Sequence, residues 1–236
     1  MLLTESSHYN YARNSFVDKI YEVCQKFEAA DVLELGGGRY PFYTHGKFPE
    51  SINSYTVNDI DQSELDAGPG GYKMACFDVC GDVSEFENKY DVIISRMFAE
   101  HVADGQAMHS NCLKLLKPGG IAFHYNPKLY SLPFFANLIL PEAVSRAILF
   151  TFKPKTGPGE RTKFPVHYSL CRGTASSMEN KIQALGYSEV QVIPFYGHNY
   201  YSHIPPLRPF ERFFTSLSMK NNWSFFSTFV YTLARR

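Results

Sequence analysis

The first half of the chain alternates between helical and strand-like patterns of apolar residues. From 12 to 29 the apolar positions recur at helical spacing, and a short apolar run, 31–35, follows and stops at three glycines. Further strand-like runs lie at 54–57, 72–77, 90–95 and 121–125, and a further helical pattern lies at 107–116. Strands separated by helical segments predict a parallel sheet with helices packed against it.

The pattern changes after residue 126. The most apolar stretch, 129–152, is interrupted by prolines and charged residues that would be costly within a bilayer, so we expect a lid or core segment, with contact at a membrane surface as an option. Long insertions in compact domains usually serve function, so 127–172 is predicted to be a substrate-recognition insertion in a single domain that spans 1–236. Later elements are a helix at 175–185 and strands at 190–194 and 225–233.

Composition indicates a globular protein with a small-molecule partner. Of the 236 residues, 44% are apolar and 19% are charged, which is enough to fill a sizeable core. Lys plus Arg (23) equals Asp plus Glu (23), so no net field attracts nucleic acid or an anionic membrane. The 20 Phe and 16 Tyr suit an apolar pocket as well as a core. We therefore expect a small-molecule substrate, no nucleic acid and no membrane span, and the oligomeric state stays open.

Cysteine usage and the first residues predict a cytoplasmic location. The five cysteines include no Cys-x-x-Cys pair of the kind that zinc and redox sites use, so reduced thiols and no metal are expected. Residues 1–14 are polar and lack the charged start and apolar run of a signal peptide.

The segment Glu34–Gly38 lies where an open α/β sheet binds its ligand, beyond the carboxyl end of a strand. A dinucleotide-binding Gly-x-Gly-x-x-Gly pattern would place its third glycine at Pro41. Gly46-Lys47 is followed by Phe48, not by the residues of a phosphate-binding loop. Both kinds of nucleotide site are therefore disfavoured, and a tight turn without a ligand is the structural alternative.

Several motifs follow one another in order between 32 and 120. They are Glu34-Leu35-Gly36-Gly37-Gly38, Asp59 after the second strand, Asp78 after the third, Asp91-Val-Ile-Ile-Ser with Glu100-His101-Val102, and Leu115-Leu116-Lys117-Pro118-Gly119-Gly120. Together they resemble the class I S-adenosylmethionine-dependent methyltransferase family. The resemblance implies a doubly wound, mostly parallel seven-stranded sheet, the Rossmann-like methyltransferase fold, with an inserted lid after the fifth strand. It also implies S-adenosyl-L-methionine as the cofactor. Tyr40 and Pro41 depart from the family pattern, so the loop should leave the cofactor differently.

The same resemblance implies a cofactor site at the strand ends. In the family, an acid after the second strand accepts hydrogen bonds from both ribose hydroxyls, and Asp59 has that position; a helix cap is the structural alternative. An acid after the third strand commonly meets the adenine amino group, as Asp78 would. The predicted cofactor-binding residues are Glu34, Gly36, Gly38, Asp59, Ile60, Asp78, Val79 and Ser95.

Candidate catalytic residues follow from the chemistry of methyl transfer. Displacement at a sulfonium methyl requires alignment, and it requires a base when the acceptor atom carries a proton. Histidines near strand ends suit that task because they titrate near physiological pH. The candidates are His101 after the fourth strand, His124 at the end of the fifth and His167 at the exit of the insertion. The structural alternatives are orientation of a loop for His101 and hydrogen bonding in the core for His124.

The sequence therefore predicts an enzyme that transfers a methyl group from S-adenosylmethionine to a small, partly apolar molecule, with oxygen favoured as the acceptor atom. Two alternatives stay open: a cofactor-binding module without turnover, and a methyltransferase that acts on RNA or protein. The equal numbers of acidic and basic residues argue against RNA.

Overall fold

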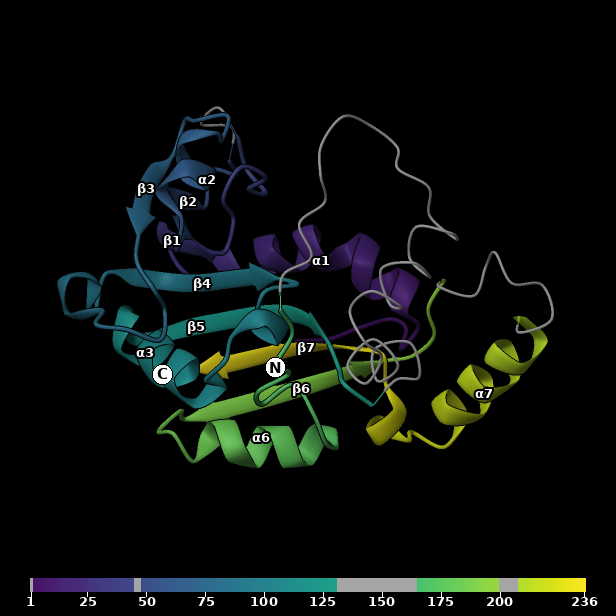
Figure 1. Cartoon of the computed structure of the whole chain (residues 1–236). Coiled ribbons are helices and arrows are strands. Elements are labelled where there is room, and N and C mark those ends of the chain that lie inside the picture. Colours follow the sequence, from purple (N-terminus) through teal and green to yellow (C-terminus); the bar gives the residue numbers. More distant parts are fainter. Residues whose placement is uncertain (1, 45–47, 131–164, 200–207) are drawn as a thin grey trace.

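A seven-stranded sheet forms the centre of the protein in the computed structural model, which describes residues 2–44, 48–130, 165–199 and 208–236 (Figure 1). Its order is β3-β2-β1-β4-β5-β7-β6. The strands are β1 (Ala30–Leu35), β2 (Ile52–Asp59), β3 (Lys73–Cys76), β4 (Tyr90–Arg96), β5 (Leu116–Pro127), β6 (Glu189–Phe195) and β7 (Phe229–Arg235). Strands β1 to β5 are parallel, and β7 runs antiparallel between β5 and β6. The predicted doubly wound, mostly parallel sheet is confirmed.

Helices cover both faces of this sheet. Helix α1 (Tyr9–Cys24) lies on one face, and α3 (Gly105–Leu115) and α6 (Ala175–Gln183) lie on the other (Figure 1). Strand β5 contacts both layers because side chains alternate along a strand: Phe123 and Tyr125 pack on α1, whereas His124 meets α3. The remaining helices are α2 (Gln62–Asp66), α7 (Arg208–Lys220) and the single-turn 3-10 helices η1 (Ser84–Phe86), η2 (Ala99–His101) and η5 (Ser224–Phe226).

The predicted helices and strands are present, with ends set by local hydrogen bonds. Helix α1 starts at Tyr9 because the His8 side chain caps it by accepting from the Asn10 amide. Strand β7 starts at Phe229, later than expected, because η5 precedes it. Helix α7 has no counterpart in the sequence prediction. Most of the predicted insertion, 127–172, lies outside the described residues, so its role stays a prediction.

Two further expectations concern cysteines and membrane spans. All five cysteines are free thiols, three of them buried. Among the described residues, no helix is both long enough and apolar enough to cross a membrane.

An aromatic cluster around Phe16 forms the centre of the α1 layer. The Phe16 ring is 1% exposed. Its centroid lies 5.4 Å from that of Phe42, 5.0 Å from Phe123, 5.4 Å from Tyr125 and 5.5 Å from Tyr231. The cluster therefore joins α1, the chain after the glycine turn, β5 and β7.

We predict that Phe16→Ala lowers the free energy of unfolding by about 3–5 kcal/mol, because the ring's contacts are lost and a cavity remains. Urea denaturation followed by circular dichroism measures the change. Val17→Ala is the matched control, since the Val17 side chain is 44% exposed on the same helix. Equal losses in the two variants would contradict a central role for the cluster.

Candidate functional site

The candidate site lies at the carboxyl ends of the parallel strands. The chain runs from β1 outward to β2 and β3 on one side and then crosses to β4 on the other side of β1, so the strand order reverses at β1. Such a switch point leaves a crevice beyond the strand ends, where open α/β sheets bind ligands. The glycine turn follows β1 at this place.

Gly36 and Gly38 allow close approach of other groups to the backbone of the turn. Both have left-handed backbone, with φ of 67° and 43°. A Cβ atom on Gly36 would lie 2.3 Å from the Phe98 ring, and one on Gly38 would lie 2.8 Å from Oδ2 of Asp59. The turn therefore has no space for a side chain at either glycine, because the Phe98 ring lies against Gly36 and the Asp59 carboxylate lies against Gly38. Phe98 is a site residue that the sequence interpretation missed, because no motif marks it.

The chain leaves the turn without forming a helix. Described residues between β1 and β2 form turns, and Pro41 is buried. The Phe42 amide donates to Glu34 Oε2 at 3.0 Å, and the Tyr55 hydroxyl donates to the same oxygen. Burial raises the pKa of Glu34 to about 7. Glu34 thus fixes the position of the loop that follows the glycine turn. This is the loop in which Tyr40 and Pro41 depart from the family pattern.

Asp59 and Asp78 lie on neighbouring strand ends. Asp59 is half-buried, its Oδ1 accepts from the Asp61 amide at 3.1 Å, and burial raises its pKa. The Phe77 amide donates to the Asp59 carbonyl, which keeps the chain that leads to Asp78 beside β2. Ile60, next to Asp59, is 69% exposed.

Val79, the other cofactor-binding residue predicted after β3, lies below the surface. Val79 is buried, and its carbonyl accepts from the Asn111 side chain at 2.8 Å. Asp78 itself is exposed, and its Oδ1 accepts from the Cys80 amide at 2.8 Å.

Ser95 and His124 lie in the core beneath α3. They are 0% and 1% exposed, and the Ser95 hydroxyl is 2.8 Å from His124 Nδ1. Burial lowers the pKa of His124 to about 3, and the nearby His109 ring adds to this. The structure therefore separates both residues from the strand-end surface and favours the structural alternative for His124.

His101 and His167 are brought together by backbone hydrogen bonds. The His167 amide donates to the Glu100 carbonyl at 2.7 Å, and His101 Nδ1 lies 2.7 Å from the Pro165 carbonyl oxygen. Because a carbonyl only accepts, this contact assigns the proton to Nδ1 and leaves the other ring nitrogen, Nε2, as the acceptor in the neutral ring. His167 is exposed, and His101 is partly exposed.

Glu100 is a second residue that the sequence interpretation missed, although it stands in the matched segment Glu100-His101-Val102. Its side chain is buried, and Oε1 lies 3.6 Å from His101 Nε2. Oε2 has no hydrogen-bond partner among the described residues. Burial raises the pKa of Glu100 to about 8. A buried carboxyl beside a histidine can hold or release a proton near neutral pH.

Strained backbone surrounds this pair. Met97, Tyr168 and Leu170 have φ of 53°, 51° and 57°, backbone angles that residues other than glycine rarely adopt. The Met97 amide donates to the Tyr125 carbonyl at 2.7 Å, which ties the ends of β4 and β5 together. Strain of this kind collects at functional sites.

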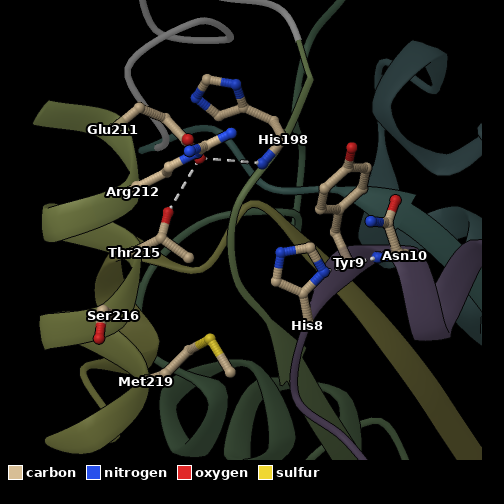
Figure 2. Close-up of a pocket in the computed structure, with 9 residues that line it drawn as sticks. All are labelled: His8, Tyr9, Asn10, His198, Glu211, Arg212, Thr215, Ser216 and Met219. Atoms are coloured by element: carbon tan, nitrogen blue, oxygen red, sulfur yellow. Dashed lines mark hydrogen bonds between the residues drawn. The ribbon is translucent and has the colours of Figure 1, made fainter. Parts of the chain in front are cut away.

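A cavity of about 470 Å³ opens between the start of α1 and α7. Figure 2 shows Arg212, Thr215 and Met219 of α7 facing His8 and Tyr9. Glu211 accepts from the Thr215 hydroxyl at 3.0 Å and from the His198 amide at 3.4 Å. The cavity lies at the same end of the sheet as the glycine turn. Strand β6 runs parallel to β5 and β1, and His198, which lines the cavity, follows the carboxyl end of β6.

The described residues contain no group of three side chains able to hold a metal ion.

Comparison with known proteins adds a family and a fold. Residues 33–124, from β1 to β5, match the family described as "Methyltransferase domain". No curated protein matches the chain in sequence. An S-adenosylmethionine-dependent methyltransferase from Archaeoglobus fulgidus is similar in structure, with a TM-score of 0.56, 16% identity, and 95% of this chain and 93% of that chain covered.

Two further solved structures share the fold. Phosphoethanolamine N-methyltransferase 2 of Haemonchus contortus, solved with S-adenosyl-L-methionine, has a TM-score of 0.53 at 12% identity, covering 93% of this chain and 52% of that chain. The [4+2]-cyclase SpnF has a TM-score of 0.52 at 12% identity, covering 100% of this chain and 84% of that chain. At such identities the likeness shows the fold alone.

We predict that Gly36→Ala destabilises the protein more than Gly70→Ala does. Gly70 also has left-handed backbone, with φ of 77°, but a Cβ there would meet nothing within 4 Å. Gly70→Ala therefore reports the backbone cost alone, about 1–2 kcal/mol, and Gly36→Ala adds the clash with Phe98. Urea denaturation measures both. Phe98→Ala in the Gly36→Ala background should recover part of the additional loss, because it removes the clashing ring. No recovery would contradict the contact.

Proposed function

We propose that this chain, whose residues 33–124 match the methyltransferase-domain family, is a class I S-adenosylmethionine-dependent methyltransferase that methylates a small, partly apolar molecule at an oxygen atom. The enzyme class and the cofactor follow from the family. The acceptor and its reacting atom are argued below from residues at the strand ends.

The residues at the glycine turn fit the cofactor. The turn leaves no room for a side chain at Gly36 or Gly38, the half-buried Asp59 carboxylate lies against Gly38, and Ile60 offers an exposed apolar surface next to Asp59. We propose that Asp59 accepts hydrogen bonds from the ribose hydroxyls and that Ile60 packs against the adenine. Asp78, Gly36 and Gly38 complete the proposed contacts, and Glu34 acts by holding the loop. When bound, the cofactor supplies a methyl group on a positively charged sulfur.

We predict that Asp59→Ala weakens binding of S-adenosylmethionine and S-adenosylhomocysteine by about 1–3 kcal/mol, because a half-buried charged hydrogen-bond acceptor is lost. Isothermal titration calorimetry measures the two affinities. Asp66→Ala is the matched control, an exposed carboxylate on the adjacent α2. Unchanged affinity in Asp59→Ala would remove Asp59 from the cofactor site, and no binding to the unaltered protein would overturn the proposed function itself.

The cavity between α1 and α7 supports a small acceptor. Its volume of about 470 Å³ is within the range of small-molecule sites. The Tyr9 ring forms part of its wall and stacks on Phe229 at 6.3 Å, and Phe229 lies 5.5 Å from Tyr125 at the end of β5. We propose that the acceptor extends from the end of β5 along these rings, with its polar part in the cavity.

The pair of His101 and Glu100 carries the proposal of an oxygen acceptor. A hydroxyl group must lose its proton as the methyl group arrives, so a base has to stand at the strand ends. We propose that His101 Nε2 takes this proton and that ionised Glu100 stabilises the imidazolium that forms. With the proton on His101, the acceptor oxygen would hold the electron pair that bonds to the methyl carbon, and the electrons of the broken carbon–sulfur bond would stay on sulfur as a neutral thioether. His167 remains a proposed alternative base because its backbone lies beside Glu100.

The pH dependence of turnover tests this pair. Burial raises the pKa of Glu100 to about 8, so the carboxyl is protonated below that pH and ionises as the pH rises through it. We predict that the rate rises through about pH 8 in the unaltered enzyme. In Glu100→Gln the rise near pH 8 is lost and the plateau is lower. His101→Ala loses roughly a hundredfold or more in kcat.

Release of S-adenosylhomocysteine in the presence of fractionated metabolite extract measures these rates. Glu87→Gln, an exposed acid before β4, is the control and keeps the pH profile of the unaltered enzyme. The same pH profile in Glu100→Gln as in the unaltered enzyme would contradict the role of Glu100. Full activity of His101→Ala would transfer the role of base away from His101.

We further propose that the reaction takes place in the cytoplasm. Support comes from the five free thiols, since a reducing compartment keeps cysteines unpaired.

A further inference from the structure

Helix α7 carries its apolar face away from the rest of the protein. Phe210, Phe213, Phe214 and Leu217 recur at the spacing of one helix face. The only residue of this helix that is buried is Ser218, while Phe210 and Phe213 are 59% and 67% exposed. The polar side with Arg212 and Thr215 lines the cavity (Figure 2). An amphipathic helix of a globular protein normally has the opposite orientation.

The exposed apolar surface continues onto the turn after the helix. Trp223, Phe225 and Phe226 are 41%, 39% and 40% exposed. The Phe226 ring lies 5.3 Å from Phe214 and 5.2 Å from Phe225, so helix and turn form one surface. We call this surface the aromatic patch; it consists of Phe210, Phe213, Phe214, Trp223, Phe225 and Phe226.

Buried contacts hold the turn that carries half of the aromatic patch. Lys128 is 0% exposed, and its Nζ donates to the carbonyls of Gly173, at 2.7 Å, and Ser224. The Ala175 amide donates to the Ser224 hydroxyl at 3.2 Å. The aromatic side chains are thus presented on an ordered support, and their exposure calls for a partner that covers them.

Charge and chain direction identify the partner's chemistry. Exposed Lys220 ends α7 just before Trp223, and exposed Arg172 precedes Gly173 at the base of the turn. Tyr130, which lies within the most apolar stretch of the sequence, 129–152, stacks on Phe225 at 4.5 Å. Aromatic rings with flanking basic residues suit the headgroup level of an anionic bilayer. A second copy is less favourable, because a symmetric contact would bring the same basic residues together.

We propose that the aromatic patch docks this protein on the surface of a bilayer that contains anionic phospholipids. The aromatic side chains enter the headgroup region, and Arg172 and Lys220 contact lipid phosphates. This surface is separate from the glycine turn and from the Glu100–His101 pair, so docking does not depend on the proposed function.

Trp223 makes the docking directly measurable, because it is the only tryptophan of the chain. We expect its fluorescence to shift to the blue when vesicles of equimolar phosphatidylcholine and phosphatidylglycerol are added, and brominated lipids to quench it. Vesicles of phosphatidylcholine alone should bind more weakly, and high salt should reduce binding to the anionic vesicles.

Substitutions assign the binding to the aromatic patch. Phe210→Ser with Phe213→Ser should weaken vesicle co-sedimentation roughly tenfold or more. Lys220→Glu with Arg172→Glu should weaken it about fivefold for each lost charge on anionic vesicles. Val17→Ser with Tyr21→Ser, two exposed apolar positions on α1, is the matched control and should bind as the unaltered protein does.

Two results would overturn the proposal. One is the absence of both a fluorescence shift and co-sedimentation with anionic vesicles for the unaltered, folded protein. The other is a blue shift that appears with rising protein concentration in the absence of lipid and is lost in the Phe210→Ser, Phe213→Ser variant, because the patch would then be an interface between two copies. Unchanged melting temperatures show that the variants remain folded, and the fluorescence titration needs no variant.

Discussion

Packing of the Phe16 ring connects the hydrophobic core with the ligand-binding edge of the sheet. Phe42 lies against the Phe16 ring, and the Phe42 amide donates to buried Glu34. The Arg96 guanidinium, at the end of β4, lies 4.3 Å from the centroid of the Phe42 ring. The position of the loop after the glycine turn is therefore set by aromatic packing, not by a helix that starts there. This arrangement replaces the helix N-terminus that open α/β sheets commonly place beside their ligands.

Alternation of side chains along β5 determines that the His124 ring is buried, whereas the His101 ring is partly exposed. His124 follows Phe123 and precedes Tyr125, which both face α1, so its own ring must face α3 and the core. His101 is free of this constraint because it lies in η2, after β4 has ended. The same η2 segment buries Glu100, and the two residues therefore combine a sheltered acid with a ring that remains partly exposed.

The sequence predicted what depends on local pattern. Apolar runs revealed the strands, and the ordered motifs revealed the sheet topology and the place of Asp59. It could not reveal Phe98 as a neighbour of Gly36, because that contact joins segments that only folding brings together. Glu100 stands next to His101 in the sequence, but its burial depends on how the chain packs around η2. Helix α7 was missed because its apolar face is turned outward, and a net charge of zero says nothing about basic residues gathered around one patch.

The antiparallel strand β7 has a consequence for the order in which the sheet can form. During synthesis β1 to β5 emerge first, and nothing yet covers the outer edge of β5, where β7 will lie. Strand β6 emerges next, but its place in the sheet depends on β7, its one neighbour among the described strands. Until β7 inserts, an apolar strand edge is open to pairing with other chains. Pairing of β7 with β5 and β6 is therefore the folding step that competes with pairing between different chains.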